Sequence, residues 1–129
     1  MSFLIREEDI PVNVHIRGET NTVSKARLYV GRETTSAYKQ SDLISLSRHK
    51  FKGKGNIYRC DVSDRIYFVI KGEITNFRVG AEIYSSVKKG DAIFIPKGTP
   101  YTWDWAESDH IIINGPAFLP GSDHILKKM

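Results

Sequence analysis

Two apolar runs decide the fold, Arg65-Ile-Tyr-Phe-Val-Ile-Lys-Gly-Glu73 and Gly90-Asp-Ala-Ile-Phe-Ile-Pro-Lys-Gly-Thr-Pro-Tyr101. In the first run, β-branched and aromatic residues follow one another from Ile66 to Ile70, a composition that favours a heavily buried strand. In the second, the opening Gly-Asp is a turn signal, Ala92 to Ile95 is a short apolar strand, and the proline after it stops further pairing. Short strands at this close spacing predict an all-β barrel or sandwich.

The spacing around the first run resembles the first sequence motif of the cupins. That motif runs glycine, five residues, His-x-His, three or four residues, glutamate, six residues, glycine. Its positions fall here on Gly53, Arg59, Asp61, Arg65 and Gly72. The glycines match, whereas every metal-ligand position carries a different residue.

The second run resembles the second cupin motif, which runs glycine, five residues, Pro-x-Gly, two residues, histidine, three residues, asparagine. Its positions fall on Gly90, Pro96, Gly98, Tyr101 and Trp105. The resemblance covers roughly residues 42–118 and implies the cupin fold, a double-stranded β-helix or jelly-roll barrel. We expect a single cupin domain over residues 1–129, with N-terminal strands and an arm in 1–40, the barrel core in 41–118 and a tail in 119–129.

The remaining strands are expected at Ala26 to Val30, Asp42 to Leu46, Asn56 to Val62 and Ile111 to Ile113. Between the second and third of these lies a basic run, Arg48 to Gly55, which ends in glycines. We expect it to be a solvated hairpin loop, or a loop whose backbone amides receive an anion.

Charge and cysteine content exclude some classes of protein. The net charge is +4 at pH 7, but 19 lysines and arginines are scattered among 15 acids, which argues against nucleic acid as the main partner. The single cysteine, Cys60, cannot form an internal disulfide and favours a reducing compartment. Only a three-residue apolar run precedes the first charges, and no segment reaches membrane-spanning length, so we expect a cytoplasmic protein without a membrane partner.

Alternation along the strands predicts which side chains face the barrel interior. Tyr58 and Cys60 share one face of their strand, and Arg59 and Asp61 share the other. The cupin register implies that Arg59 and Asp61 point inward. In the next strand, Arg65, Tyr67 and Val69 are expected inside, and the outward face is expected to carry Ile66, Phe68 and Ile70.

The residues at the ligand positions predict that no metal is bound there. In metal-bearing cupins these positions supply three histidines and a glutamate to a divalent metal. Here they carry Arg59, Asp61, Arg65 and Tyr101, and guanidinium groups repel a cation instead of binding it. We expect no cofactor, and a displaced metal site that uses His49 or His110 stays open.

The same residues fit a site for a small molecule. Arg59 and Arg65 could hold a carboxylate or phosphate through bidentate hydrogen bonds, and the rings of Tyr67, Trp103 and Trp105 could stack on a sugar or planar ring. Asp61 could act as a base, and Tyr101 could exchange a proton beside an arginine. We therefore expect a cupin barrel that binds a small anionic or sugar-like molecule, with metal-independent isomerase or epimerase activity as the catalytic hypothesis.

Other interpretations stay open. Asp61 could simply neutralise the two arginines, and Trp103 and Trp105 could fill the barrel, which would leave a non-catalytic binding or structural module. The run Asp64-x-Ile-x-x-Val-x-x-Gly-Glu73 is also similar to the cupins of ethanolamine-utilisation operons, to which an acyl-phosphate kinase activity has been ascribed. Those proteins keep an acid where this chain has Arg65.

The outward face of Ile66, Phe68 and Ile70 predicts a homodimer, because unpaired apolar surfaces favour association. In cupins, N-terminal strands such as those expected in residues 1–26 often pair with a neighbouring subunit. His124 and Lys127 in the tail are expected on ordinary surface.

Overall fold

The computed structural model describes residues 3–17, 22–32 and 37–127. These residues form a short 3-10 turn, η1 (Glu7–Asp9), and eleven strands, with no α-helix among them. The strands are β1 (Asn13–Arg17), β2 (Thr22–Gly31), β3 (Lys39–Gln40), β4 (Ser45–Gly53), β5 (Ile57–Cys60), β6 (Asp64–Val79), β7 (Glu82–Lys88), β8 (Ala92–Ile95), β9 (Tyr101–Thr102), β10 (Trp105–Gly115) and β11 (Asp123–Lys127). The prediction of an all-β fold is confirmed. No helix in this part of the chain is long and apolar enough to cross a membrane.

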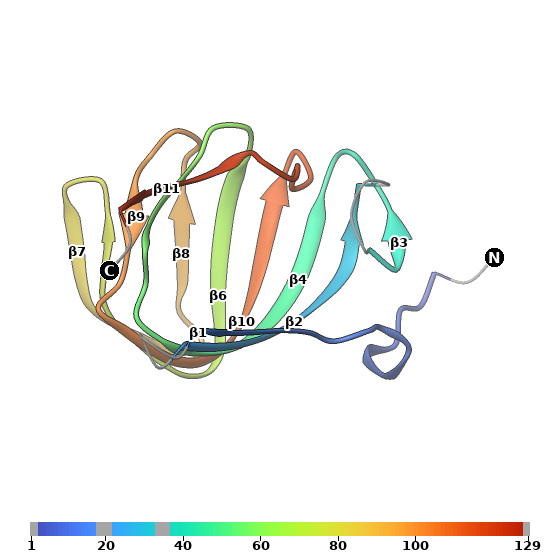
Figure 1. Cartoon of the computed structure of the whole chain (residues 1–129), viewed down its shortest axis with the longest axis horizontal. Coiled ribbons are helices and arrows are strands. Elements are labelled where there is room, and N and C mark those ends of the chain that lie inside the picture. Colours follow the sequence, from blue (N-terminus) through green and yellow to red (C-terminus); the bar gives the residue numbers. More distant parts are fainter. Residues whose placement is uncertain (1–2, 18–21, 33–36, 128–129) are drawn as a thin grey trace.

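All the strands belong to one sheet that curls round on itself (Figure 1). Its order is β1-β2-β4-β10-β6-β9-β5-β11, with β3 added to β2, and β7 and β8 added to β6. The two ends of the sheet, β1 and β11, pass in front of the central strands in Figure 1. The curl therefore encloses an interior that the central strands line.

Strand β6 connects the two halves of the curled sheet. Its first half pairs with β8, its second half pairs with β7 and β9, and β10 pairs with it across both halves, from Asp64 to Thr75. Between the halves lies Gly72, at a positive φ of 83°. The β6–β10 register shifts between Asp109 and His110, close to this glycine. A bulge of this kind bends a strand, which lets one strand serve both halves of the barrel.

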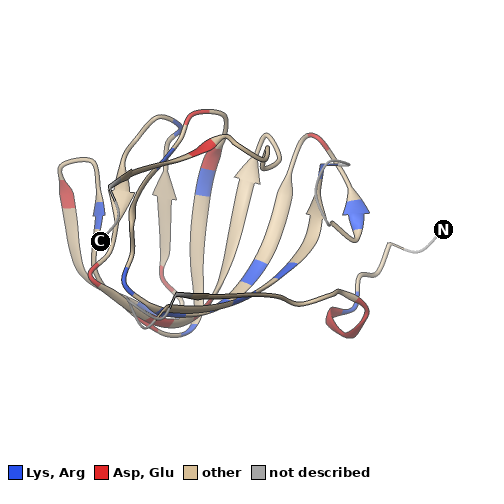
Figure 2. Cartoon of the chain, in the orientation of Figure 1, with Lys and Arg blue, Asp and Glu red and all other residues tan. Residues whose placement is uncertain are grey.

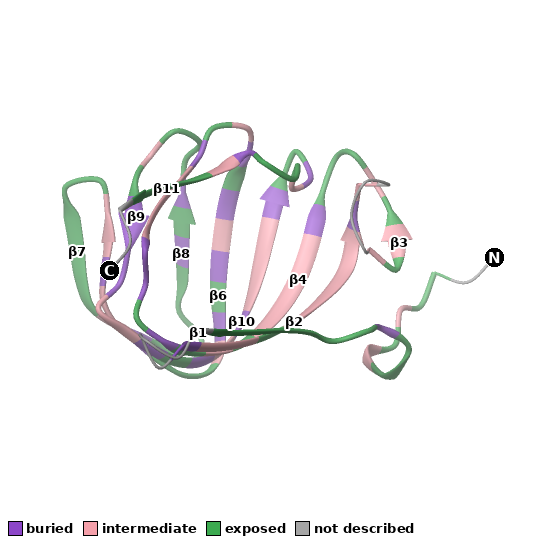
Figure 3. Cartoon of the chain, viewed as in Figure 1, coloured by how far each residue is buried: buried purple, intermediate pink, exposed green. Residues whose placement is uncertain are grey.

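Burial alternates along the first half of β6 as the sequence predicts. Arg65, Tyr67 and Val69 are buried, whereas Phe68 between them is exposed. Figure 3 shows a similar alternation of buried and exposed segments along β8. Tyr67 and Val69 join a core cluster that includes Ile74, Phe77 and Trp103. The outward residues form the outer surface of the barrel.

Two segments differ from, or add to, the expected layout. Residues Arg48 to Gly53 form no loop, because β4 runs through them and pairs with β2 on one side and β10 on the other. In the expected tail, Asp123–Lys127 forms β11, which pairs antiparallel with β5. Charged residues are distributed over the strands and loops without a face of one sign in Figure 2.

Candidate functional site

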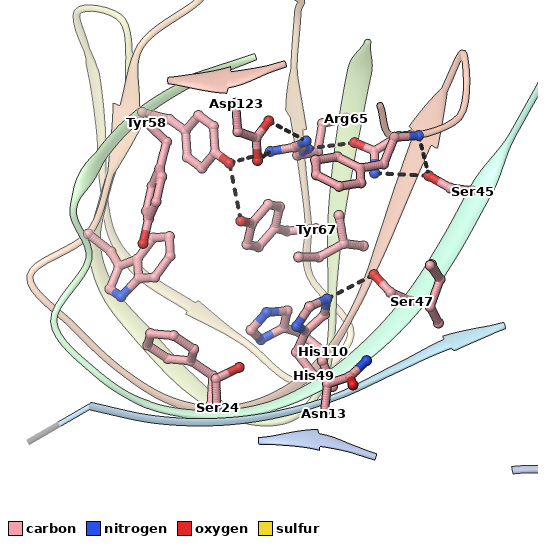
Figure 4. Close-up of a pocket in the computed structure, with 18 residues that line it drawn as sticks. Asn13, Ser24, Ser45, Ser47, His49, Tyr58, Arg65, Tyr67, His110 and Asp123 are labelled. Atoms are coloured by element: carbon pink, nitrogen blue, oxygen red, sulfur yellow. Dashed lines mark hydrogen bonds and ion pairs between the residues drawn. The ribbon is translucent and has the colours of Figure 1, made fainter. Parts of the chain in front are cut away.

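A partly open cavity of about 320 Å³ lies inside the curled sheet. This volume falls at the lower end of the range typical for pockets that hold small molecules. In Figure 4, Arg65 and Asp123 lie at one end of the cavity, His49 and His110 lie at the other, and Tyr67 lies between them. The cavity thus brings together side chains from β4, β6, β10 and β11.

Arg65 is the most highly connected polar side chain of the cavity. It donates from Nε to Asn114 Oδ1 at 2.5 Å and from one terminal nitrogen to the Tyr101 hydroxyl at 2.6 Å. Its two terminal nitrogens also donate to the Asp123 carboxylate at 3.2 and 2.9 Å. Burial alone would lower the pKa of Arg65, but Tyr101, Tyr67 and Asp123 together raise it above its ordinary value. Arg65 is therefore a permanent cation whose guanidinium is hydrogen-bonded to Asn114, Tyr101 and Asp123.

Two tyrosines extend this network towards the centre of the cavity. The hydroxyl groups of Tyr67 and Tyr101 are 3.3 Å apart, and both side chains are buried. Burial raises the pKa of Tyr67 and of Tyr101, although Arg65 acts in the opposite direction on both. Both phenols are consequently protonated at neutral pH and can donate a proton or a hydrogen bond.

His49 and His110 form a stacked pair at the other end of the cavity. They are cross-strand partners on β4 and β10, and their ring centroids are 5.5 Å apart with an interplanar angle of 14°. His49 Nε2 is 2.8 Å from the Ser47 hydroxyl, and His110 Nδ1 is 2.8 Å from the Ser108 hydroxyl. Burial, with the charges of Arg65 and His15, lowers the pKa of His49 to about 4. Burial, with the neighbouring His49, lowers the pKa of His110 to about 3, so both imidazoles are neutral at pH 7.

Aromatic rings form one wall of the cavity. Tyr58 stacks on Trp103 with ring centroids 5.7 Å apart, and Phe51 meets Trp103 edge-on at 5.4 Å. The indole Nε1 of Trp103 donates to the Gly53 carbonyl at 3.3 Å, which fixes the orientation of the ring. This wall offers a flat apolar surface on which a planar ring could stack.

Four of the residues that the sequence singles out lie together on the cavity wall: Arg65, Tyr67, Tyr101 and Trp103. Trp105 does not line the cavity. It starts β10, where its carbonyl accepts a hydrogen bond from the Thr75 hydroxyl at 3.1 Å. The prediction that Trp103 and Trp105 together stack on a ligand therefore fails at Trp105. The remaining rings leave the cavity unfilled.

The prediction that Arg59 and Asp61 point inward is wrong. Neither residue lines the cavity, whereas Tyr58 does. Arg59 Nε donates to Asp61 Oδ1 at 2.8 Å, with 36% and 42% of the two side chains exposed. Asp61 Oδ2 also lies 3.1 Å from His124 Nε2, and Arg65 is paired with Asp123 instead. The reason is that the cupin-motif alignment is displaced by one residue along β5. A displacement of one residue assigns every side chain of a strand to the opposite face.

Sequence reasoning did not place Tyr58 or Asp123 in the site, and it named His49 and His110 only as candidate ligands of a displaced metal site. For Tyr58 a signal existed, because Tyr58 and Cys60 make the apolar face of β5 and Arg59 and Asp61 make the charged face. For the histidines, the cross-strand register that joins them cannot be read from the sequence. Asp123 reaches the cavity only because β11 folds back onto β5.

The residues at the cupin ligand positions do not fit a divalent metal. With the observed orientation of β5, the inward side chain at the first ligand position is Tyr58, and the later ones are Arg65 and Tyr101. Arg65 places a guanidinium there, and a fixed cation repels a metal ion. Among the described residues, no group of three or more histidine, cysteine, aspartate or glutamate side chains could hold a metal ion. The stacked histidine pair alone offers two ligands.

The charge balance of the cavity differs from the one expected. Two arginines facing a single acid predicted a cationic pocket, but Arg59 lies outside the cavity and Asp123 neutralises Arg65. The observed groups can instead accept a proton at a neutral imidazole and donate one from a buried phenol. The cavity thus has the components of acid–base chemistry together with a stacking surface.

No family model and no curated protein matches the sequence. Solved structures do match the fold. Pac13 from Streptomyces, described as a nucleoside dehydratase, is 14% identical, with a TM-score of 0.76 over 100% of this chain and 94% of its own. KdgF from Halomonas sp. is 13% identical, with a TM-score of 0.69 over 92% and 96% of the two chains. An RmlC-like cupin from Shewanella frigidimarina is 13% identical, with a TM-score of 0.59 over 91% and 93%.

Three further Pac13 structures are variants with uridine, in which a tyrosine is replaced by phenylalanine or a histidine by glutamine. At these levels of identity the likeness establishes the architecture. It agrees with the spacing of glycines and proline that the sequence shares with the cupin motifs. The chain has the cupin fold.

Proposed function

We propose that this protein is a metal-independent enzyme that moves protons on a small sugar-like molecule carrying a planar ring. The reaction class is elimination, isomerisation or epimerisation, each of which begins with removal of a proton from carbon. The observation that carries the proposal is that one cavity holds two neutral imidazoles and an arginine-backed pair of tyrosines.

The histidines supply the base. A buried imidazole that is neutral at pH 7 can accept a proton without first losing one, and the hydroxyl groups of Ser47 and Ser108 orient the two rings. The burial that keeps the imidazoles neutral also makes them weak bases, because it lowers the pKa to about 4 for His49 and about 3 for His110. A substrate whose proton is already acidified by a neighbouring carbonyl group fits this strength best.

The tyrosines supply the acid and the stabilising charge. Tyr67 and Tyr101 remain protonated and can donate to an oxygen on which negative charge develops. Arg65 donates to the Tyr101 oxygen at 2.6 Å, which stabilises that phenol when it gives up its proton. A leaving hydroxyl group or an enolate oxygen near this pair would therefore be stabilised without a metal.

The wall of Tyr58, Phe51 and Trp103 supports a ligand with a flat ring. The fold neighbour Pac13, a nucleoside dehydratase with structures that contain uridine, makes nucleosides the first ligands to test. Elimination of water from a sugar needs the same pair of groups, a base at carbon and an acid at the leaving oxygen.

Proton exchange with solvent tests the proposal whatever the product of the reaction is. The protein is incubated with uridine, with nucleosides whose sugar carries an aldehyde or keto group and with free sugars in heavy water containing EDTA, and carbon-bound protons are followed by NMR. We expect loss of a specific carbon-bound proton signal, or new product signals, with at least one compound. His49→Gln or His110→Gln should slow this reaction by about a hundredfold or more, the usual contribution of a positioned acid–base group.

Asp104→Asn serves as the matched control, because Asp104 is ion-paired to Arg78 at 2.7 Å and does not line the cavity. This variant should react like the wild type. Binding of a panel member without any exchange or product would contradict an enzyme and leave a binding module. A reaction that requires an added metal ion would contradict the metal-independent mechanism.

A further inference from the structure

Asp123 forms an ion pair with Arg65 at one end of the cavity (Figure 4). We propose that Asp123 is a specificity-determining residue whose carboxylate occupies the anion-binding edge of Arg65, so that the cavity accepts uncharged ligands and refuses anionic ones. This inference rests on the proposed function, because it concerns the same cavity and narrows its ligands to the uncharged members of their class.

Arg65 has the features of an anion receptor. Its side chain is only 4% exposed, and a guanidinium presents two parallel N–H groups that match the oxygens of a carboxylate or phosphate. The Asp123 carboxylate accepts hydrogen bonds from both terminal nitrogens of Arg65, at 2.9 Å to one oxygen and 3.2 Å to the other. Asn114 and Tyr101 accept from the same guanidinium, so four of its five N–H groups are already used. An external anion therefore finds its natural contact filled.

Electrostatics act in the same direction. Of the described residues that line the cavity, only Arg65 and Asp123 carry a formal charge at neutral pH, since burial keeps His49 and His110 uncharged. The two charges cancel. An anionic ligand would meet the Asp123 carboxylate first, because 32% of that side chain is exposed and it is the more exposed partner of the pair. Like charges at contact distance in a partly desolvated site repel strongly.

The fold holds the Asp123 carboxylate in place from both faces of β11. Asp123 is the cross-strand partner of Cys60, and its neighbour His124 is the partner of Arg59. On the outer face, His124 Nε2 lies 3.1 Å from Asp61 Oδ2, while on the inner face Asp123 binds Arg65. The backbone that carries the carboxylate is therefore held by contacts on both faces of β11. Asp123 behaves as a built-in replacement for an anionic ligand.

Inorganic sulfate is the probe that tests this inference. Its binding is measured by calorimetry for the wild type, for Asp123→Asn, and for the double variant Asp123→Asn/Arg65→Gln. We expect Asp123→Asn to bind sulfate at least tenfold more tightly than the wild type, because Arg65 then lacks its counter-ion. The double variant should lose this gain, and Asp104→Asn, which opens an ion pair outside the cavity, should match the wild type.

Equal sulfate affinity in the wild type and Asp123→Asn would overturn the inference, as would a gain in affinity that survives the Arg65 substitution.

If Asp123→Asn does not fold in chloride, it is refolded in acetate at the same ionic strength. Recovery of the native circular dichroism spectrum in acetate alone supports the inference, and no recovery overturns it. The sulfate titration requires no nucleoside and no catalytic turnover, so its result is independent of the proton-exchange experiment. Failure of the proton-exchange experiment with a positive sulfate result would sink the proposed function alone, and the reverse would sink this inference alone.

Discussion

His49 and His110 are kept uncharged at neutral pH by the protein around them. Their rings stack between β4 and β10, away from bulk water, so a proton added to either ring would be poorly solvated. The pKa values of about 4 and about 3 express this penalty. The same arrangement that prepares the rings to accept a proton from a ligand therefore makes the fold sensitive to acid.

We expect the free energy of unfolding to fall as the pH is lowered from 7 to 5. In the unfolded chain both histidines take up a proton near their ordinary pKa of 6.5, whereas in the folded protein they do so only near pH 4 and pH 3. The unfolded state thus binds more protons in this window, and each histidine should cost about 2 kcal/mol of stability between pH 7 and pH 5. Urea unfolding at a series of pH values measures the slope.

Substitution of one histidine provides the check. His110→Gln should remove about half of the slope between pH 7 and pH 5, whatever it does to stability at pH 7. His124→Gln is the control, because that side chain lies at the surface beside Asp61. A slope that His110→Gln leaves unchanged would contradict the buried, neutral imidazole.

Strand β6 is the element on which the barrel depends, because it pairs with β8 in one half, with β7 and β9 in the other, and with β10 across both. Gly72 lies where these halves meet. A Cβ added there would overlap the Glu107 carbonyl oxygen on the neighbouring β10, closer than any real Cβ atom tolerates. The backbones of β6 and β10 can approach this closely only at a residue without a side chain.

Gly72→Ala is expected to destabilise the fold by about 3 kcal/mol or more, since it adds a steric clash to the penalty of a positive φ. Gly90→Ala is the matched comparison. Its φ of 91° is similar, but a Cβ there would have no neighbour within 4 Å. It should cost only about 1–2 kcal/mol. Chemical denaturation of both variants gives the two values, and equal losses would mean that the contact with Glu107 is not tight.

Strand β5 shows how far the sequence could predict the site. The glycines and proline predicted the fold, and alternation in the cupin register placed Arg65 and Tyr67 inside. In the four-residue β5 the same register, aligned on Gly53, placed the inward positions one residue too late. The pairing of β4 with β10 and the return of β11 depend on contacts far apart in the sequence, so the histidine pair and Asp123 could not be predicted.

At the scale of the whole molecule, one row of the outer face of the barrel is apolar across five strands. Register pairs carry the row from β2 through β4, β10 and β6 to β8, and its members are Val30, Leu46, Ile113, Ile66 and Phe94. None of them is buried, and Phe94 is 58% exposed. This face continues the outward Ile66 and Phe68 that predict a homodimer from the sequence. A closed two-fold dimer that packs this face on itself is the simplest way to cover it.

Phe94→Asp should weaken such a dimer by at least tenfold, because it places a charge on the most exposed side chain of the apolar row. Ile83→Asp on β7 is the control, since Ile83 is 61% exposed but lies outside this row. Sedimentation equilibrium over a range of concentrations measures both variants and the wild type. A wild type that stays monomeric at high micromolar concentration, or a dimer indifferent to Phe94→Asp, would contradict the prediction.

The most direct test of the central claim, that the cavity with the histidine pair binds its ligand without a metal, is histidine NMR in the presence of EDTA. The chain has four histidines, so single substitutions assign every imidazole signal. Titration with uridine and the nucleoside and sugar panel is expected to shift the signals of His49 and His110 and to leave that of His124 unchanged. Signals of His49 and His110 that stay fixed at saturating concentrations of every compound, or that shift only after a divalent metal is added, would contradict the claim.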